Sequence, residues 1–282
     1  AIWKVFFKPW APTDVQREKV FNLPGVVLAL VVLFFVIHAF RTYGLTVDED
    51  GWVFRTFAYV AGRMTFNFDP DAVATALTDL SNGSDGSQLA VARYLLGDGS
   101  FQPWTLVTYG FLHADWMHVS MNSLWLVAFG APVAQRLAPV RFLALFFVGT
   151  AAGALTYYLL HPVQFIPLVG ASAGVSAVMG AACRFIFQPG GPLGPVDTFQ
   201  MQAEDAMRVP AVTLADSWKN LRILQFIAIW FVINLAVGVL AVPLGITETG
   251  VAWEAHIGGF IVGFFFFGLF DPRFAPRREQ MQ

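Results

Sequence analysis

Residues 142–183 read FLALFFVGTAAGALTYYLLHPVQFIPLVGASAGVSAVMGAAC, 42 residues without a single Asp, Glu, Lys or Arg. A helix needs about 20 mostly apolar residues to cross a bilayer, so this stretch is long enough for two crossings. His161-Pro162, Pro167 and Gly170 interrupt it, and they predict a break between the two helices. The stretch therefore indicates a membrane-embedded helical hairpin.

The rest of the chain has the same character. Of its 282 residues 56% are apolar and only 13% are charged, whereas a soluble domain carries about 25% charge. We therefore expect an all-α polytopic membrane protein, a bundle of six transmembrane helices. The predicted membrane domain covers residues 23–271, between an N-terminal segment 1–22 and a C-terminal tail 272–282. Four further charge-free runs complete the six spans: 20–40, 116–135, 223–247 and 255–270.

The basic residues predict the orientation of this bundle. Thirteen of the 17 Lys and Arg fall on one side of a six-span arrangement, and cytoplasmic loops are enriched in these residues. We therefore expect both termini to be cytoplasmic, and we interpret the first run as a retained helix rather than a cleaved signal. The compact size favours a bacterial plasma membrane.

The loop 41–115 between the first two spans is too long to be all coil in a compact protein. Asp69-Pro70 predicts the start of a short helix, because Asp caps helices and Pro suits the first helical position. The loop is either an interfacial platform at the outer surface or a plain connection.

The second span carries polar side chains at its outer end. His118 and Asn122 are four residues apart, so they share one helix face, and both can donate hydrogen bonds. Polar residues at membrane depth are costly and are functional candidates by default. The alternative is that they bridge neighbouring helices, an interaction of about 1 kcal/mol.

The fourth span begins at Gly170-Ala171-Ser172, just after the Pro167 and Gly170 breaks. Ser172 should therefore lie in the first turn of a helix, where free backbone N–H groups and the helix dipole stabilise an oxyanion. The small residues that follow also suit close helix packing, which alone would explain them. The motif Gly170-x-Ser172-x-Gly174 matches the nucleophile elbow of α/β-hydrolases too, but its charge-free context excludes a soluble sheet.

A serine nucleophile needs a base, and the last span supplies His256. Gly259 and Gly263 form a small-residue seam that can bring this helix against the fourth span. His256 lies about one turn before the seam, near the outer end of its helix, as Ser172 does on its own helix. The sequence therefore predicts that the two side chains meet.

These motifs together resemble the rhomboid intramembrane serine proteases. They are His113-x4-His118-x3-Asn122, Gly170-Ala-Ser172 and Ala255-His256-x2-Gly259-x3-Gly263, in the order and on the spans typical of that family. Three positions differ from the usual pattern, the first being Thr105, where an Arg is common. Ala173 replaces a Gly after the serine, and Ser176 stands where many relatives have a Tyr that stacks on the catalytic histidine.

The resemblance implies an intramembrane serine endopeptidase with a catalytic dyad. Ser172 would be the nucleophile and His256 the general base and acid, while Asn122, His118 and the backbone N–H of Ser172 would form the oxyanion hole. His113 would be a supporting residue at the same end, as would three glycines. These are Gly170, Gly259 and Gly263.

The expected partners are transmembrane protein substrates and the lipid bilayer. We expect no nucleic acid, because 17 basic residues nearly balance 19 acidic ones, and no metal or other cofactor. The lone Cys183 in an apolar run is expected to be a small packed hydrophobe. Two other functions stay open: a catalytically inactive rhomboid-like factor that binds membrane proteins, and a small transporter or channel. The short fourth and sixth runs predict a water-filled recess open to the outside.

Overall fold

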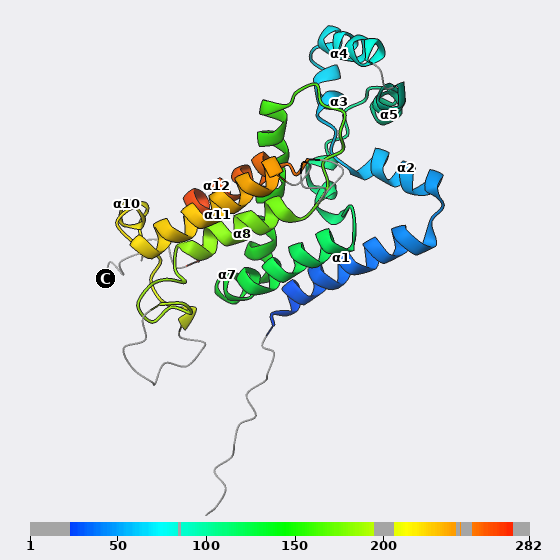
Figure 1. Ribbon diagram of the computed structural model, residues 1–282. Helices are drawn as coiled ribbons and strands as arrows, with labels where there is room; N and C mark the ends of the chain where they lie inside the picture. Colours follow the sequence, from blue (N-terminus) through cyan, green and yellow to red (C-terminus); the bar gives the residue numbers. More distant parts are fainter. Residues whose placement is uncertain (1–22, 84–85, 195–205, 241–242, 244–249, 273–282) are drawn as a thin grey trace, which may run out of the picture.

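The fold is all-helical. The computed structural model describes residues 23–83, 86–194, 206–240, 243 and 250–272, and this part of the chain contains no β-strand, only one isolated bridge between Tyr59 and Leu168. The predicted all-α class is thus confirmed for the described residues, while the cytoplasmic location of the termini stays a prediction. The elements in Figure 1 are α1 (Gly25–Gly44), α2 (Val47–Phe57), α3 (Ala61–Phe66), α4 (Pro70–Asn82), α5 (Gly86–Leu96), α6 (Thr105–Thr108), the 3-10 helix η1 (Tyr109–Phe111), α7 (Trp116–Leu160), α8 (Ser172–Cys183), α10 (Leu214–Ser217), α11 (Leu221–Leu240) and α12 (Trp253–Phe270).

Four of the described helices are long and apolar enough to cross a membrane, namely α1, α7, α11 and α12. The 45-residue α7 is broken at Ala138, whose φ of 63° and ψ of 164° are not helical, and Pro139 follows directly. Since a proline cannot donate the helical hydrogen bond, the chain changes direction there and α7 has two arms. Residues 116–137 and 139–160 correspond to the predicted second and third spans, but the count of six crossings stays a prediction.

The predicted breaks between the third and fourth spans are confirmed. Helix α7 ends at Leu160, directly before His161-Pro162, and α8 begins at Ser172. The sequence predicts a fourth span from Ser172 to about Phe187, but helix α8 ends about four residues earlier, at Cys183. Its 12 residues measure about 18 Å at 1.5 Å per residue, which is well short of a bilayer core.

The core of the bundle is the packing of α8 against α7 and α12. Every residue of α8 after Ser172 is buried. Ala177 lies between two glycines: a Cβ added to Gly149 of α7 would overlap its methyl group, and a Cβ added to Gly263 of α12 would overlap its carbonyl oxygen. Small residues thus let three backbones approach closely, as predicted for the seam on α12.

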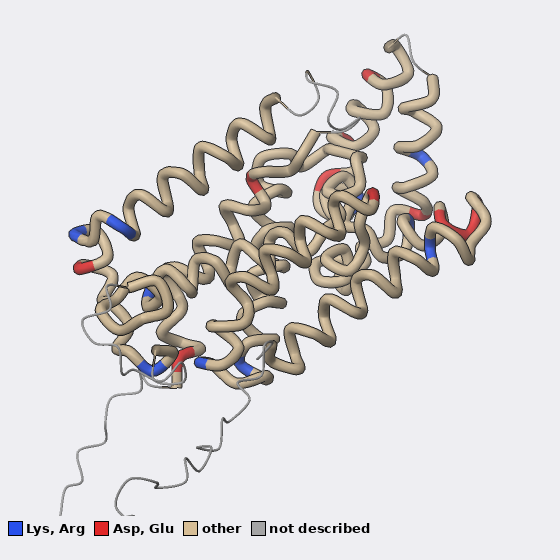
Figure 2. Tube along the Cα trace, turned by 60° about the horizontal axis from the view of Figure 1, so that its bottom comes forward, with Lys and Arg blue, Asp and Glu red and all other residues tan. Residues whose placement is uncertain are grey.

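The 41–115 region forms a separate helical layer, in which α3, α4 and α5 gather away from the bundle (Figure 1). The predicted helix start at Asp69-Pro70 is confirmed, since the Asp69 carboxylate accepts a hydrogen bond of 3.0 Å from the backbone N–H of Ala72. The buried Arg63 of α3 donates to the Gln102 side chain at 2.7 Å. In Figure 2 the charged residues lie mainly in this layer and at the helix ends, whereas the long helical stretches are uncharged.

Candidate active site

The chain turns sharply before the candidate nucleophile. Gly170 has φ +116°, a conformation that residues with a side chain rarely adopt, and a Cβ there would lie 2.6 Å from Nε2 of His118. Position 170 therefore requires a glycine, both for its backbone conformation and because a side chain would collide with His118. Ser172, which opens α8, is partly exposed, and its hydroxyl makes no hydrogen bond to any described residue.

His118 faces this turn from the first turn of α7. The Asp115 carboxylate caps the helix by accepting from the His118 backbone N–H at 2.8 Å. The backbone N–H of Ala114 lies 3.4 Å from Nδ1 of the His118 ring and donates to it. Because Nδ1 accepts, the proton of the neutral imidazole is on Nε2, the atom that lies against Gly170. His118 can therefore donate a hydrogen bond into the space beside Ser172.

Asn122 lies one helical turn after His118 and is buried, with 5% of its surface exposed. One of its two amide N–H groups donates to the His118 carbonyl oxygen at 3.1 Å. An Asn amide has two N–H donors, so the second is left for another acceptor. The spacing predicted from the sequence thus gives two donors on one face of α7.

His113 connects the start of α8 to two other parts of the bundle. Its ring is fully buried, and its Nε2 accepts from the Ala171 backbone N–H at 3.5 Å. Its carbonyl oxygen accepts from the Arg41 guanidinium of α1 at 2.9 Å. Burial lowers the pKa of His113 to about 3, so the ring is neutral and stays an acceptor. His113 therefore helps to fix the turn that contains Ser172.

His256 lies in the first turn of α12, one turn before the seam with α8. A Cβ on Gly259 would overlap the Ala173 carbonyl oxygen, so the two helices are in backbone contact next to Ser172. A hydrogen bond between Ser172 and His256, which a dyad requires during reaction, is absent among the described residues. The Nδ1 atom of His256 instead contacts Oδ1 of Asn234 in α11, at 2.5 Å.

Asn234 is the site residue that the sequence reasoning missed. It is polar within the otherwise apolar run 223–247, and a polar residue at membrane depth is a functional candidate. The same rule singled out His118 and Asn122, so the signal was present.

The departures at Ala173 and Ser176 have different surroundings. The Ala173 methyl group packs against Gly153 of α7, where a Cβ would overlap it, so α7 provides the room for this methyl group. Ser176 is buried on α8, and its hydroxyl cannot stack on an imidazole as an aromatic ring would. The extra methyl group is accommodated, whereas Ser176 offers His256 no aromatic ring to stack on.

The described residues around Ser172 form no cluster for a metal ion, and Glu254 does not orient His256. The described ranges contain no group of three or more His, Cys, Asp and Glu side chains able to hold a metal ion. Glu254, two residues before His256, pairs instead with His161 at 3.1 Å. The described side chains around Ser172 are suited to hydrogen bonding and proton transfer.

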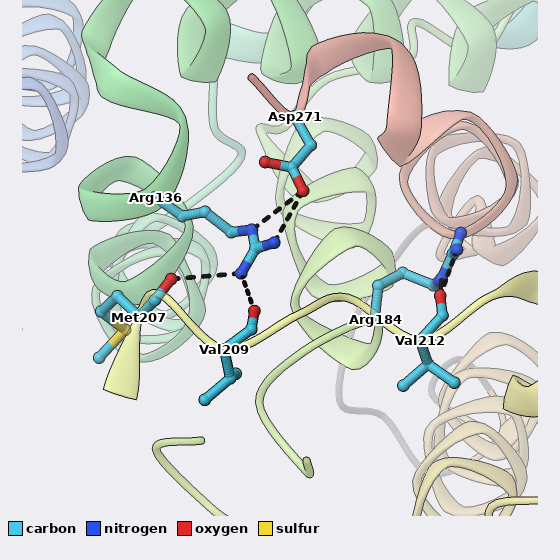
Figure 3. Close-up of polar contacts among 6 residues, drawn as sticks. All are labelled: Arg136, Arg184, Met207, Val209, Val212 and Asp271. Carbon is cyan, nitrogen blue, oxygen red and sulfur yellow. Dashed lines mark hydrogen bonds and ion pairs between the residues drawn. The ribbon is translucent and has the colours of Figure 1, made fainter. Parts of the chain in front are cut away.

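The opposite ends of the same helices hold buried arginines (Figure 3). Arg136 pairs with Asp271 at 2.7 Å, and both side chains are almost fully buried. It also donates to the carbonyl oxygens of Met207 and Val209, at 3.2 and 2.7 Å. Arg184 donates to the Val212 carbonyl oxygen at 3.0 Å in the same way. These contacts attach the segment 207–212 to the end of the first arm of α7 and to the ends of α8 and α12.

The fold and the site define a class, a helical membrane bundle in which Ser172, His118 and His256 lie in the first turns of α8, α7 and α12. Residues 100–272 match the Rhomboid domain family, so the chain belongs to the rhomboid family and is an integral multi-pass membrane protein. It is 35% identical over 137 residues to Rhomboid-like protein 16, chloroplastic, of Arabidopsis thaliana, over 47% of this chain and 42% of that protein. The chain therefore matches less than half the length of this relative. A bacterial plasma membrane stays a prediction.

Proposed function

We propose that this rhomboid family member is an intramembrane serine endopeptidase that hydrolyses peptide bonds in or near transmembrane segments of other membrane proteins. The observation that carries the proposal is the gathering of partly exposed Ser172 and His118 around the Gly170 turn, with the His256 helix in backbone contact beside them.

The proposed reaction has two halves. The Ser172 Oγ attacks the peptide carbonyl carbon while its proton passes to Nε2 of His256, and the C–N bond then breaks as that proton moves to the leaving amine. An acyl-enzyme on Ser172 remains. Water then gives a proton to Nε2 and attacks the ester, and the carboxyl product leaves as Ser172 regains its proton from His256.

The developing oxyanion needs preorganised donors. The Nε2–H of His118, the free amide N–H of Asn122 and the backbone N–H of Ser172 are the proposed donors. Their orientation is supported by the acceptor role of His118 Nδ1 and by the single internal bond of the Asn122 amide. In addition, α8 begins without a side-chain cap, which favours its first N–H groups for this role.

The substrate must leave its helical state before it can react. The carbonyl groups of a transmembrane helix are already hydrogen-bonded, so small or helix-weakening residues near the cleaved bond should favour cleavage. The 12-residue α8 is too short to span the bilayer core, which supports water access at the Ser172 end.

The test is cleavage of a transmembrane reporter by the purified protein in liposomes. The parent chain should produce fragments and the Ser172→Ala variant none. Fragments from both chains would refute the serine mechanism. If neither chain cleaves any of several reporters while both remain folded, the function is the non-catalytic binding of membrane proteins. The missing Ser172 to His256 hydrogen bond favours that second candidate.

A further inference from the structure

The imidazole of His256 contacts a side chain of a neighbouring helix. This side chain is Asn234, in the second half of α11. Most of α11 is exposed to its surroundings, with only Ile223 and Trp230 buried, but Asn234 is partly buried against α12. The amide thus lies on the face of α11 that meets the helix of His256.

The orientation of the Asn234 amide follows from its second contact. Its Nδ2 donates to the Trp230 carbonyl oxygen, one turn earlier in α11, at 2.7 Å. A carbonyl oxygen can only accept, so a flipped amide would set two oxygens against each other. Oδ1 must therefore face His256. It lies 2.5 Å from Nδ1 of the ring, and Nδ1 is the donor of this hydrogen bond.

Two aromatic contacts hold Asn234 in this position, one turn on either side of it. Four residues before Asn234, the Trp230 ring stacks on Phe260 of α12 with centroids 4.3 Å apart. Four residues after it, Gly238 lies directly against the Trp253 ring, which a Cβ at position 238 would overlap. His256 lies between these two contacts on α12. The register of the helices therefore aims the amide at the imidazole.

We propose that Asn234 is a positioning residue for His256. By accepting the Nδ1 proton it fixes the tautomer in which Nε2 is bare, the form that can take the proton of Ser172. It also restrains the ring plane, a task that Ser176 cannot perform by stacking. This inference rests on the proposed function, which it deepens by naming the third side chain of the catalytic unit.

The experiment compares three variants of the full chain in the reporter assay. Asn234→Leu keeps the shape of the side chain but removes the acceptor, and Asn234→Asp keeps an acceptor. Leu235→Ala is the matched control, because this neighbour on α11 is 38% exposed. We expect Asn234→Leu to lower kcat at least about tenfold, within the roughly 10²–10⁴-fold that general acid–base catalysis contributes. KM and the unfolding temperature should stay at their parent values.

The pH profile separates positioning from a merely structural role. In Asn234→Asp a carboxylate faces Nδ1 and favours the protonated ring, so the acid limb of the kcat profile should move to higher pH. The activity of this variant above that limb should remain within about tenfold of the parent, since the acceptor is kept. If Asn234→Asp loses as much kcat as Asn234→Leu at every pH, or if Asn234→Leu keeps the parent kcat, the proposal is wrong.

A spectroscopic measurement keeps the inference independent of catalysis. The chain has only 5 histidines, so the ring nitrogens of His256 can be assigned by nitrogen-15 NMR against a His256→Gln variant. The parent should show a protonated Nδ1 and a bare Nε2, and Asn234→Leu should lose the protected Nδ1–H signal. A parent ring protonated at Nε2 would overturn the inference. If the parent cleaves no reporter, the proposed function fails while this measurement still decides the Asn234 contact.

Discussion

The two ends of the central helices differ in how their polar groups are satisfied. We call them the Ser172 end, where α8 and α12 begin, and the Arg136 end, where the first arm of α7, α8 and α12 finish. At the Ser172 end the serine hydroxyl has no hydrogen bond among the described residues and is partly exposed. At the Arg136 end the guanidinium of Arg136 makes four hydrogen bonds and is buried.

The difference shows that the Arg136 end stabilises the fold, whereas the Ser172 end presents groups that can bind a substrate. A buried guanidinium with acceptors on every side holds one arrangement of the chain, and losing an acceptor is costly. A hydroxyl and an imidazole nitrogen without partners contribute little to folding, but they are free to bind a substrate.

The largest expected effect is on catalysis at the Ser172 end. Ser172→Ala and His256→Ala should each lower reporter cleavage by at least about 10⁴-fold, and the double variant should lose no more, because the two groups act as a unit. The unfolding temperature of Ser172→Ala should match the parent, since no hydrogen bond is lost. Ser120→Ala on an exposed position of α7 is the control. Partial losses that multiply in the double variant would show that the two residues act separately.

The Arg136 end should show the reverse pattern. Arg136→Met leaves the buried Asp271 carboxylate without its guanidinium, which costs about 3–5 kcal/mol when one partner of a buried pair is removed. The fraction that remains folded should cleave at the parent rate, because Ser172 lies at the other end of α8. Unfolding in detergent measures the loss of stability. Active-site titration gives the cleavage rate per folded molecule.

Arg141→Met is the matched control for this prediction, since Arg141 is exposed near the same end. It should leave the unfolding free energy unchanged within about 0.5 kcal/mol. Equal stability of Arg136→Met and Arg141→Met would contradict the structural role of the buried pair.

The sequence predicts the features that depend on neighbouring residues, but not the contacts between residues far apart in the chain. The break before α8, the Asp69 cap and the seam at Gly259 are local patterns, and the sequence predicts each of them. The contact of Asn234 with His256 joins residues 22 positions apart on two apolar helices. Nothing in the apolar pattern of α11 fixes its rotation against α12, so this contact could not be derived from spacing.

The Arg136 pair escaped prediction for a related reason. The sequence reasoning used Arg136 only as a positive charge that orients the bundle. Its partner Asp271 is 135 residues away, and the pairing depends on where α7 and α12 end in space. Charge counting therefore predicted the side of the membrane but not the buried ion pair.

The close contact between Gly153 of α7 and Ala173 of α8 should give a smaller effect on the free energy of unfolding. A Cβ at position 153 would overlap the Ala173 methyl group and lie 2.8 Å from the Ala255 carbonyl oxygen, so Gly153→Ala should cost about 1–3 kcal/mol through overpacking. Adding Ala173→Gly should recover part of that loss. A double-mutant cycle measured by unfolding in detergent gives the coupling, and additive effects would exclude direct contact.

The smallest expected effect is a pH dependence of stability at the Ser172 end. Burial lowers the pKa of His113 to about 3 in the folded chain, against an ordinary value of 6.5. The unfolded chain thus takes up the proton first, so the stability that neutral His113 contributes is complete above pH 6.5 and falls as the pH drops toward 3. His113→Gln keeps an acceptor for Ala171 but does not titrate. Between pH 7.5 and about 5.5 the parent should lose about 1 kcal/mol more unfolding free energy than His113→Gln. Parallel stability curves would show that His113 has the same pKa in the folded and unfolded chains, so that burial does not keep its ring neutral.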